Sequence, residues 1–204
     1  VNPIFGLEKL KQVDSLKNRE FTSGERELMK AHLMKNKPLW LYVQFCYYCW
    51  LRPKEIAQLR VNQIDLNRGK IKLITAGETK NKKIKYVDIP APFFTAIKDL
   101  PYPKNRDQFF FAHDGKDKLF GYKQFAKNRF STYHSKVRDK LELSKDVKFY
   151  GWKRNGVCDA YRNGVGIYEI MQHGRWSGLK EVQTYLEKSG LMINNDIIIK
   201  MPQI

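Results

Sequence analysis

Apolar residues recur at helical spacing in the first third of the chain. Thr22 and Glu25 form a capping-box pattern, and an apolar face follows them at intervals of three and four residues. Pro38 opens a second run that stays apolar through Trp50, and Pro53 stands where the first turn of a third helix would begin. We therefore expect three helices before residue 60.

Beyond these helices the pattern changes to alternation. Residues 71–75 and 84–88 alternate on either side of a lysine-rich segment, 77–82, which predicts a β-hairpin or a small antiparallel sheet with a basic turn. After two prolines, Phe93 to Leu100 is expected to form a short helix. Gln108 to Ala112 fits either a buried strand or an apolar turn.

The second half of the chain is predicted to be mostly helical. The pattern favours one long, basic, amphipathic helix over Gly121–Leu143, followed by helices over Trp152–Arg162, Ile167–Gln172 and Leu179–Lys188. Leu191–Ile204 is apolar without a polar face of its own. The fold class is therefore mainly α with a small antiparallel β-sheet (α+β).

The net charge of the chain indicates a polyanionic partner. The 204 residues suit one domain, or one large and one small unit, and carry a net charge of +17 from 38 Lys and Arg against 21 Asp and Glu. Such an excess usually serves a polyanion, most often nucleic acid and next an anionic membrane surface. No run of apolar residues is long enough to span a bilayer, and the first residues lack a signal-peptide pattern. Because the chain starts with Val1, we expect it to be a fragment of a longer protein.

Three cysteines, Cys46, Cys49 and Cys158, form an odd and sparse set, which indicates reduced thiols and a cytoplasmic location. Cys46 and Cys49 have CxxC spacing, but no second Cys or His pair lies at zinc-finger distance. Because they lie in the apolar run 39–51, we expect buried helical cysteines rather than a metal or redox site. No metal ion and no nucleotide cofactor is expected.

A protein that cuts a DNA strand without a metal needs three kinds of group. One is a nucleophile, for which a tyrosine hydroxyl can serve, since a phosphotyrosine link conserves the bond energy for rejoining. The others are donors to the non-bridging phosphate oxygens and an acid for the departing 5′ oxygen. Among 38 basic residues, this reasoning alone does not select the donors.

The first selection comes from a family resemblance. The segment WLRPKEIAQLR, residues 50–60, followed by Ile64-Asp65, resembles the first signature box of the tyrosine recombinases, also called phage integrases. The resemblance implies that Arg52 binds the scissile phosphate and that Glu55 orients the site. Lys80 resembles the family's hairpin lysine, which protonates the leaving oxygen. Lys82 and Lys83 remain alternatives for that role.

A second signature box lies near the end of the chain. Gly174-Arg175-Trp176-Ser177, followed by Thr184-Tyr185-Leu186, resembles the segment that ends in the family's nucleophile. Trp176 lies nine residues before Tyr185, which is the family's spacing for a His or Trp that donates to a phosphate oxygen. The resemblance therefore implies that Tyr185 attacks DNA and that Trp176 helps to hold the phosphate.

The family's His-x-x-Arg motif is altered here, because Tyr150 and Lys153 stand at the His and Arg positions. Lysine keeps the charge but loses the planar fork that binds phosphate through two hydrogen bonds, and tyrosine does not accept a proton near neutral pH as histidine does. The same pair resembles integrases of Bacteroides-type conjugative elements, which favours an active variant. Arg154 supplies the charge if the motif is shifted by one residue.

The four histidines have no role in this scheme. His173 has the wrong spacing to Tyr185 and is expected to be a structural residue at a helix end. His32, His113 and His134 are expected to be isolated and exposed.

The resemblance implies a catalytic domain over residues 1–190 with a three-stranded antiparallel sheet. It implies site-specific DNA recombination, the integration or excision of a mobile element, through a 3′-phosphotyrosine intermediate. Residues 191–204 are expected to form a tail that packs either on a neighbouring protomer or within its own chain, and an N-terminal DNA-clamping domain is expected to be absent from this fragment.

The expected partner is double-stranded DNA, bound by a homotetramer that is monomeric when free, with no membrane involved. Three alternatives remain open. The chain could be a catalytically impaired DNA-binding relative, a basic RNA-binding helical protein, or a type IB topoisomerase, which shares the tyrosine nucleophile.

Overall fold

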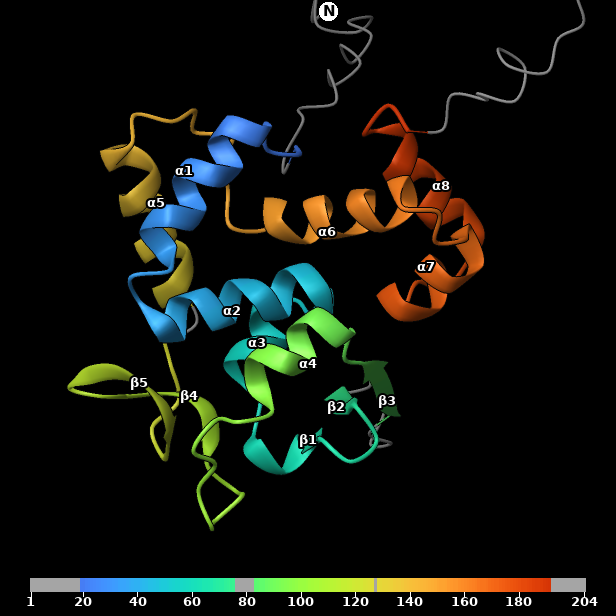
Figure 1. Ribbon diagram of the computed structural model, residues 1–204. Coiled ribbons are helices and arrows are strands. Elements are labelled where there is room, and N and C mark those ends of the chain that lie inside the picture. Colours follow the sequence, from blue (N-terminus) through green and yellow to red (C-terminus); the bar gives the residue numbers. More distant parts are fainter. Residues whose placement is uncertain (1–18, 76–82, 127, 192–204) are drawn as a thin grey trace, which may run out of the picture.

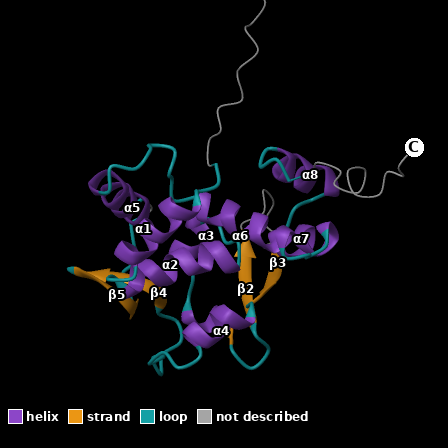
Figure 2. Cartoon of the chain, turned by 45° about the horizontal axis from the view of Figure 1, so that its top comes forward, coloured by secondary structure: helices purple, strands orange, loops and turns teal. Residues whose placement is uncertain are grey.

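The computed structural model describes residues 19–75, 83–126 and 128–191, which form a mainly helical domain with two small sheets (Figures 1 and 2). The predicted fold class, mainly α with a small antiparallel sheet, is confirmed. No helix within those three ranges is long and apolar enough to cross a membrane.

Three helices open the described chain, as predicted: α1 (Ser23–Leu33), α2 (Lys37–Tyr48) and α3 (Pro53–Ala57). The predicted capping box is present, because the Thr22 hydroxyl accepts from the backbone N–H of Glu25 at 3.2 Å and the Glu25 carboxylate accepts from that of Thr22 at 2.8 Å. Helix α2 runs through the main hydrophobic core, and six of its 12 residues are buried.

The predicted hairpin forms the middle and one edge of a three-stranded antiparallel sheet. Strands β1 (Ile64–Asp65), β2 (Lys70–Thr75) and β3 (Lys83–Asp88) lie in that order, and helix α4 (Ala91–Ile97) follows. The turn that carries Lys80 lies outside the described residues, as does Lys82, and the side chain of Lys83 is likewise not described.

A second sheet lies where the predicted long helix was expected to begin. Strands β4 (Phe109–Asp114) and β5 (Lys116–Gly121) pair antiparallel, so Gln108–Ala112 lies largely in a strand, and helix α5 spans only Arg129–Lys140. Gly115 has φ of 76°, a backbone conformation that glycine adopts without strain, and it turns the chain tightly between the two strands. Because residues 116–121 bond to β4, the prediction of a helix beginning at Gly121 was wrong.

Three further helices complete the described chain: α6 (Gly151–Arg162), α7 (Ile167–Gly174) and α8 (Leu179–Glu187). Figure 1 shows α6 running from the side of α1 and α5 to that of α7 and α8. Helix α6 contributes Trp152 to the large core and Val157 to a smaller core that packs α7 and α8 against Trp50. It thus joins the two halves of the fold.

The prediction for three histidines was wrong. His134 is fully buried, and its Nε2 accepts a hydrogen bond from the indole N–H of Trp152 at 3.1 Å. Burial lowers the pKa of His134 to about 3, so the ring is a neutral part of the core. His113 is not isolated, since its Nδ1 lies 2.9 Å from Asp117, and both His113 and His32 are only partly exposed.

The cysteines agree with the prediction. Cys46, Cys49 and Cys158 are free and buried, with Cys46 inside α2 and Cys49 at its C-terminal cap. Burial raises the pKa of the Cys46 thiol to about 12, so these groups behave as small apolar core residues.

Candidate active site

The start of α3 holds Arg52 and Glu55 together. Pro53 begins the helix, and the Glu55 carboxylate turns back to accept the backbone N–H of Arg52 at 2.7 Å. The same carboxylate lies 3.3 Å from the Arg52 guanidinium, whose side chain is 50% exposed. The local structure of the helix end therefore fixes an arginine at the surface with an acid behind it.

Glu55 has a second partner, Arg175, which the sequence analysis did not single out. The Arg175 guanidinium donates to Glu55 Oε2 at 2.9 Å, and its side chain is only 4% exposed. Burial lowers the pKa of Arg175, an effect that the Glu55 charge opposes. The one signal in the sequence was its place directly before Trp176. Glu55 thus joins two guanidinium groups, one exposed and one buried.

Lys153 lies beside this cluster, fully within the protein. Its residue is 1% exposed, and its Nζ lies 5.2 Å from the ring centre of Trp176 and 5.9 Å from that of Tyr150. Burial, and then the charges of Arg52 and Arg175, lowers the pKa of Lys153 to about 7. The start of α6 therefore brings Lys153, and Tyr150 at the N-cap of the helix, close to Arg52 and Glu55.

Tyr185 lies on α8 next to the same indole, with ring centres of Tyr185 and Trp176 separated by 5.4 Å. Its hydroxyl is buried and has no hydrogen-bond partner among the described residues. Burial, followed by the nearby Tyr150, raises the pKa of Tyr185 well above its ordinary value. The phenol is therefore protonated and must lose its proton when it reacts.

Arg154 contacts Tyr185 from another direction. Its guanidinium lies 4.8 Å from the Tyr185 ring centre, and it donates to the Tyr185 carbonyl at 2.9 Å and to the Ser189 hydroxyl at 2.8 Å. These bonds tie the C-terminal end of α8 to α6. Lys153 and Arg154 are the two candidates for the cation of the altered motif. Of the two, Lys153 is the one that lies near Arg52 and Arg175.

The structure thus brings together six of the seven residues selected from the sequence, which come from α3, the start of α6, the turn before α8, and α8 itself: Arg52, Glu55, Tyr150, Lys153, Trp176 and Tyr185. The seventh, Lys80, lies outside the described residues.

His173 lies close by but serves the fold. Its Nε2 is 2.9 Å from the carbonyl oxygen of Tyr48, and its ring packs edge-on against Trp50 with centres 4.5 Å apart. This agrees with the structural role predicted for it at a helix end.

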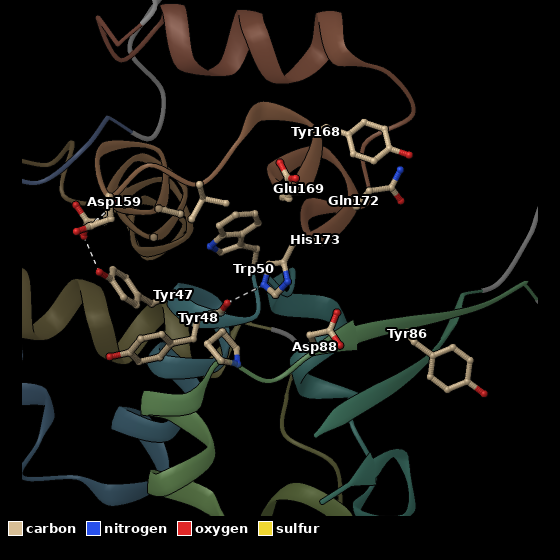
Figure 3. A pocket seen from close by; sticks show the side chains of 15 residues that line it. Tyr47, Tyr48, Trp50, Tyr86, Asp88, Asp159, Tyr168, Glu169, Gln172 and His173 are labelled. Atoms are coloured by element: carbon tan, nitrogen blue, oxygen red, sulfur yellow. Dashed lines mark hydrogen bonds between the residues drawn. The ribbon is translucent and has the colours of Figure 1, made fainter. Parts of the chain in front are cut away.

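Several grooves lie near the cluster in the described part of the chain, and two of them differ in the charge of their lining. One, of about 470 Å³, begins at Arg52 and passes Lys54 and Arg60 on its way to β2, so basic side chains follow its course. The other, of about 730 Å³, lies between α2, α6, α7 and β3 and is lined by tyrosines and acids (Figure 3). In Figure 3 the Tyr47 hydroxyl reaches Asp159, and none of the six gathered residues lines this groove. Of these two grooves, the first suits a phosphate backbone better.

Comparison with known proteins agrees with this geometry. Solved structures with the same fold are tyrosine-type recombinases and integrases. The phage integrase family matches residues 23–190, and the chain belongs to that family. No curated protein matches the chain. The narrower resemblance to integrases of Bacteroides elements stays a prediction.

Three structures show the range of similarity. XerA recombinase is 15% identical with a TM-score of 0.67, over 91% of this chain and 66% of that one. The Tn1549 transposon integrase in complex with transposon right end DNA is 11% identical with a TM-score of 0.64, over 94% and 67%. The catalytic domain of bacteriophage HP1 integrase is 19% identical with a TM-score of 0.58, over 90% and 94%. The chain therefore spans about two thirds of XerA but nearly all of the HP1 domain, and the three TM-scores show that the fold is shared.

Proposed function

We propose that this chain is the catalytic domain of a site-specific DNA recombinase that integrates or excises a mobile element. The observation that carries the proposal is the cluster in which the Trp176 ring contacts both Lys153 and Tyr185, while Arg52 lies close enough to Lys153 to lower its pKa. Positive groups and an N–H donor around a tyrosine are what phosphoryl transfer to a hydroxyl requires. Membership of the phage integrase family supports the same reading.

In the proposed reaction the Tyr185 oxygen attacks a DNA phosphorus, and the bond from phosphorus to the 5′ oxygen breaks. The products are a 3′-phosphotyrosine link and a free 5′ hydroxyl. The phenol releases one proton to water, and Lys80 supplies one to the departing oxygen, so the step is balanced in protons. Arg52, Lys153 and Trp176 hold the non-bridging oxygens, while Glu55 orients Arg52. Attack by a 5′ hydroxyl reverses the step and rejoins the strand.

The proposed partner is double-stranded DNA, and the proposed assembly is a homotetramer on DNA that is monomeric when free. Complexes of the Tn1549 integrase with transposon DNA and of XerH recombinase with its difH substrate support DNA as the partner. Buried, reduced cysteines are consistent with work in the cytoplasm.

A nicked duplex that loses its cleaved 5′ fragment by diffusion tests the chemistry directly, because rejoining is then blocked. We expect the chain to form an adduct with this DNA that survives denaturing electrophoresis, and Tyr185→Phe to form none. Tyr168→Phe, at an exposed tyrosine on the neighbouring helix α7, is the matched control and should retain the adduct.

Absence of the adduct in the wild-type chain, with DNA binding intact, would replace this proposal by that of a DNA-binding relative that has lost catalysis. Preferential binding of RNA without an adduct would point to the RNA-binding alternative.

A further inference from the structure

Arg175 occupies a backbone position that glycine fits best. It ends α7 with φ of 60° and ψ of 36°, the left-handed conformation that strains residues with a Cβ atom. The turn folds Trp176 back, so that its backbone N–H donates to the carbonyl oxygen of Met171 at 3.1 Å and its ring packs over Gly174. A glycine would make the same turn without strain, which directs attention to what the arginine side chain does.

The Arg175 side chain contacts a second residue with a strained backbone, Trp50. Trp50 also has a positive φ, 50°, and its carbonyl oxygen lies 3.4 Å from the Arg175 guanidinium. Of the four non-glycine residues with positive φ in the described part of the chain, two thus meet at the candidate site. Backbone strain of this kind is retained where the surroundings fix it, and such places are often functional sites.

The Arg175 side chain also leaves the cluster with an excess of positive charge. Three cationic groups, Arg52, Lys153 and Arg175, surround one carboxylate, Glu55, which contacts the two guanidinium groups at 3.3 and 2.9 Å. Two of the three cations are almost completely buried. Uncompensated buried charge opposes folding, but it favours the approach of an anionic phosphodiester.

We propose that Arg175 is a positioning residue for strand cleavage, which holds Arg52 through Glu55 and adds a permanent positive charge beside Lys153. The inference rests on the proposed function and extends it to a residue outside both the first signature box and the altered motif. In this arrangement Lys153 is one of two buried cations. The other is the guanidinium of Arg175, in the turn before Trp176, which stays charged where the lysine titrates.

The test compares rates of adduct formation on the nicked duplex in a single turnover, using the full chain. Arg175→Gly should fold, because glycine relaxes the turn, and its cleavage rate should fall by roughly 10- to 100-fold. Arg175→Lys keeps the charge but not the fork, so it should recover part of that loss. Glu142→Gly relaxes the same backbone conformation at an exposed residue after α5 and should cleave as the wild type does.

A second substrate separates charge from packing. A neutral methylphosphonate at the scissile position removes the phosphate charge that Arg175 is proposed to balance. On this substrate the loss caused by Arg175→Gly should shrink to a few-fold, whereas a merely structural defect would slow both substrates equally and overturn the inference. Cleavage of the ordinary substrate by Arg175→Gly within about twofold of the wild-type rate would also overturn it. A wild-type chain that forms no adduct would instead overturn the proposed function, and this inference with it.

Discussion

At the residue scale, the buried side chain of Lys153 lowers the stability of the folded protein, although the proposed site requires its charge. A lysine ammonium buried to 1% exposure loses its hydration, and the nearby Arg52 and Arg175 add repulsion. The aromatic faces of Trp176 and Tyr150 offset only part of this cost. An apolar side chain of similar length would fit the same space better, so the lysine is retained for what its charge does.

This argument predicts that Lys153→Met stabilises the fold in a way that depends on pH. The folded-state pKa of Lys153 is about 7 against an ordinary 10.5, so in that window the unfolded chain binds more protons. The wild type therefore gains stability as pH rises from 7 towards 10.5, by up to about 1.4 kcal/mol per pH unit. The advantage of Lys153→Met should be greatest at pH 7 and below and should vanish near pH 10.5.

Urea unfolding of both proteins at several pH values between 6.5 and 9.5 measures this difference. Lys136→Met, at an exposed lysine on α5, is the matched control and should show a small difference that does not change with pH. A Lys153→Met advantage that is the same at every pH would contradict the argument. The variant should also form no adduct with nicked DNA, so it would gain stability while losing activity.

At the scale of elements, the proposed site depends on how closely α6 approaches α2. Gly156 allows this approach, because a Cβ atom there would lie 2.0 Å from the backbone oxygen of Tyr47. Helix α2 leads directly to Trp50 and Arg52, and α6 carries Lys153 in its first turn with Tyr150 at its N-cap. A change in the spacing of these two helices would therefore move both halves of the cluster.

We predict that Gly156→Ala destabilises the protein, because the added methyl group meets backbone rather than a side chain that can move. Overpacking of this kind costs about 1–3 kcal/mol, or roughly 3–10 °C in melting temperature for a chain of this size. Gly24→Ala is the control, since Gly24 lies in the first turn of α1 with no atom within 4 Å of an added Cβ. Melting followed by circular dichroism should show a loss for Gly156→Ala alone; equal melting temperatures would rule the explanation out.

Prediction from sequence succeeded where the deciding interactions are local. The capping box at Thr22 and Glu25, and the alternation that pairs β2 with β3, are patterns of neighbouring residues, and both elements formed as expected. The basic segment after Gly121 failed because its start pairs with β4, a contact between strands that helical periodicity does not reveal. An Asp-Gly turn at Asp114 and Gly115 was the local signal for that hairpin.

For the candidate site, prediction from sequence failed where a residue's role depends on a contact with a residue far away along the chain. Tyr150, Lys153 and Tyr185 were selected through a family resemblance and spacing, and the fold gathers them. Arg175 was missed because its importance lies in a contact with Glu55, 120 residues away. His134 was misjudged for the same reason, since its partner Trp152 and the surrounding phenylalanines come from other elements.

At the scale of the whole molecule, the net charge of +17 raises the question of whether binding to DNA is localised or diffuse. If DNA follows the groove that begins at Arg52, lysines along it should contact phosphates, and lysines elsewhere should act only through the total charge. Lys54 lines this groove on α3. Lys35 lies in the turn before α2, and the 12 residues of that helix place it about 18 Å along the axis from the Trp50 end.

Lys54→Gln and Lys35→Gln each remove one unit of charge from exposed side chains, so they separate the two cases. We expect Lys54→Gln to weaken binding to all duplex sequences alike and to reduce the slope of log affinity against log salt by about one, since each phosphate contact releases about 0.9 of a counterion. Lys35→Gln should leave that slope close to the wild-type value. Fluorescence anisotropy of a labelled duplex between 50 and 250 mM salt measures both slopes. Equal reductions in the two variants would mean that the net charge attracts DNA without fixing its position on the protein. The groove beside Arg52 would then not be the binding site of the phosphate backbone.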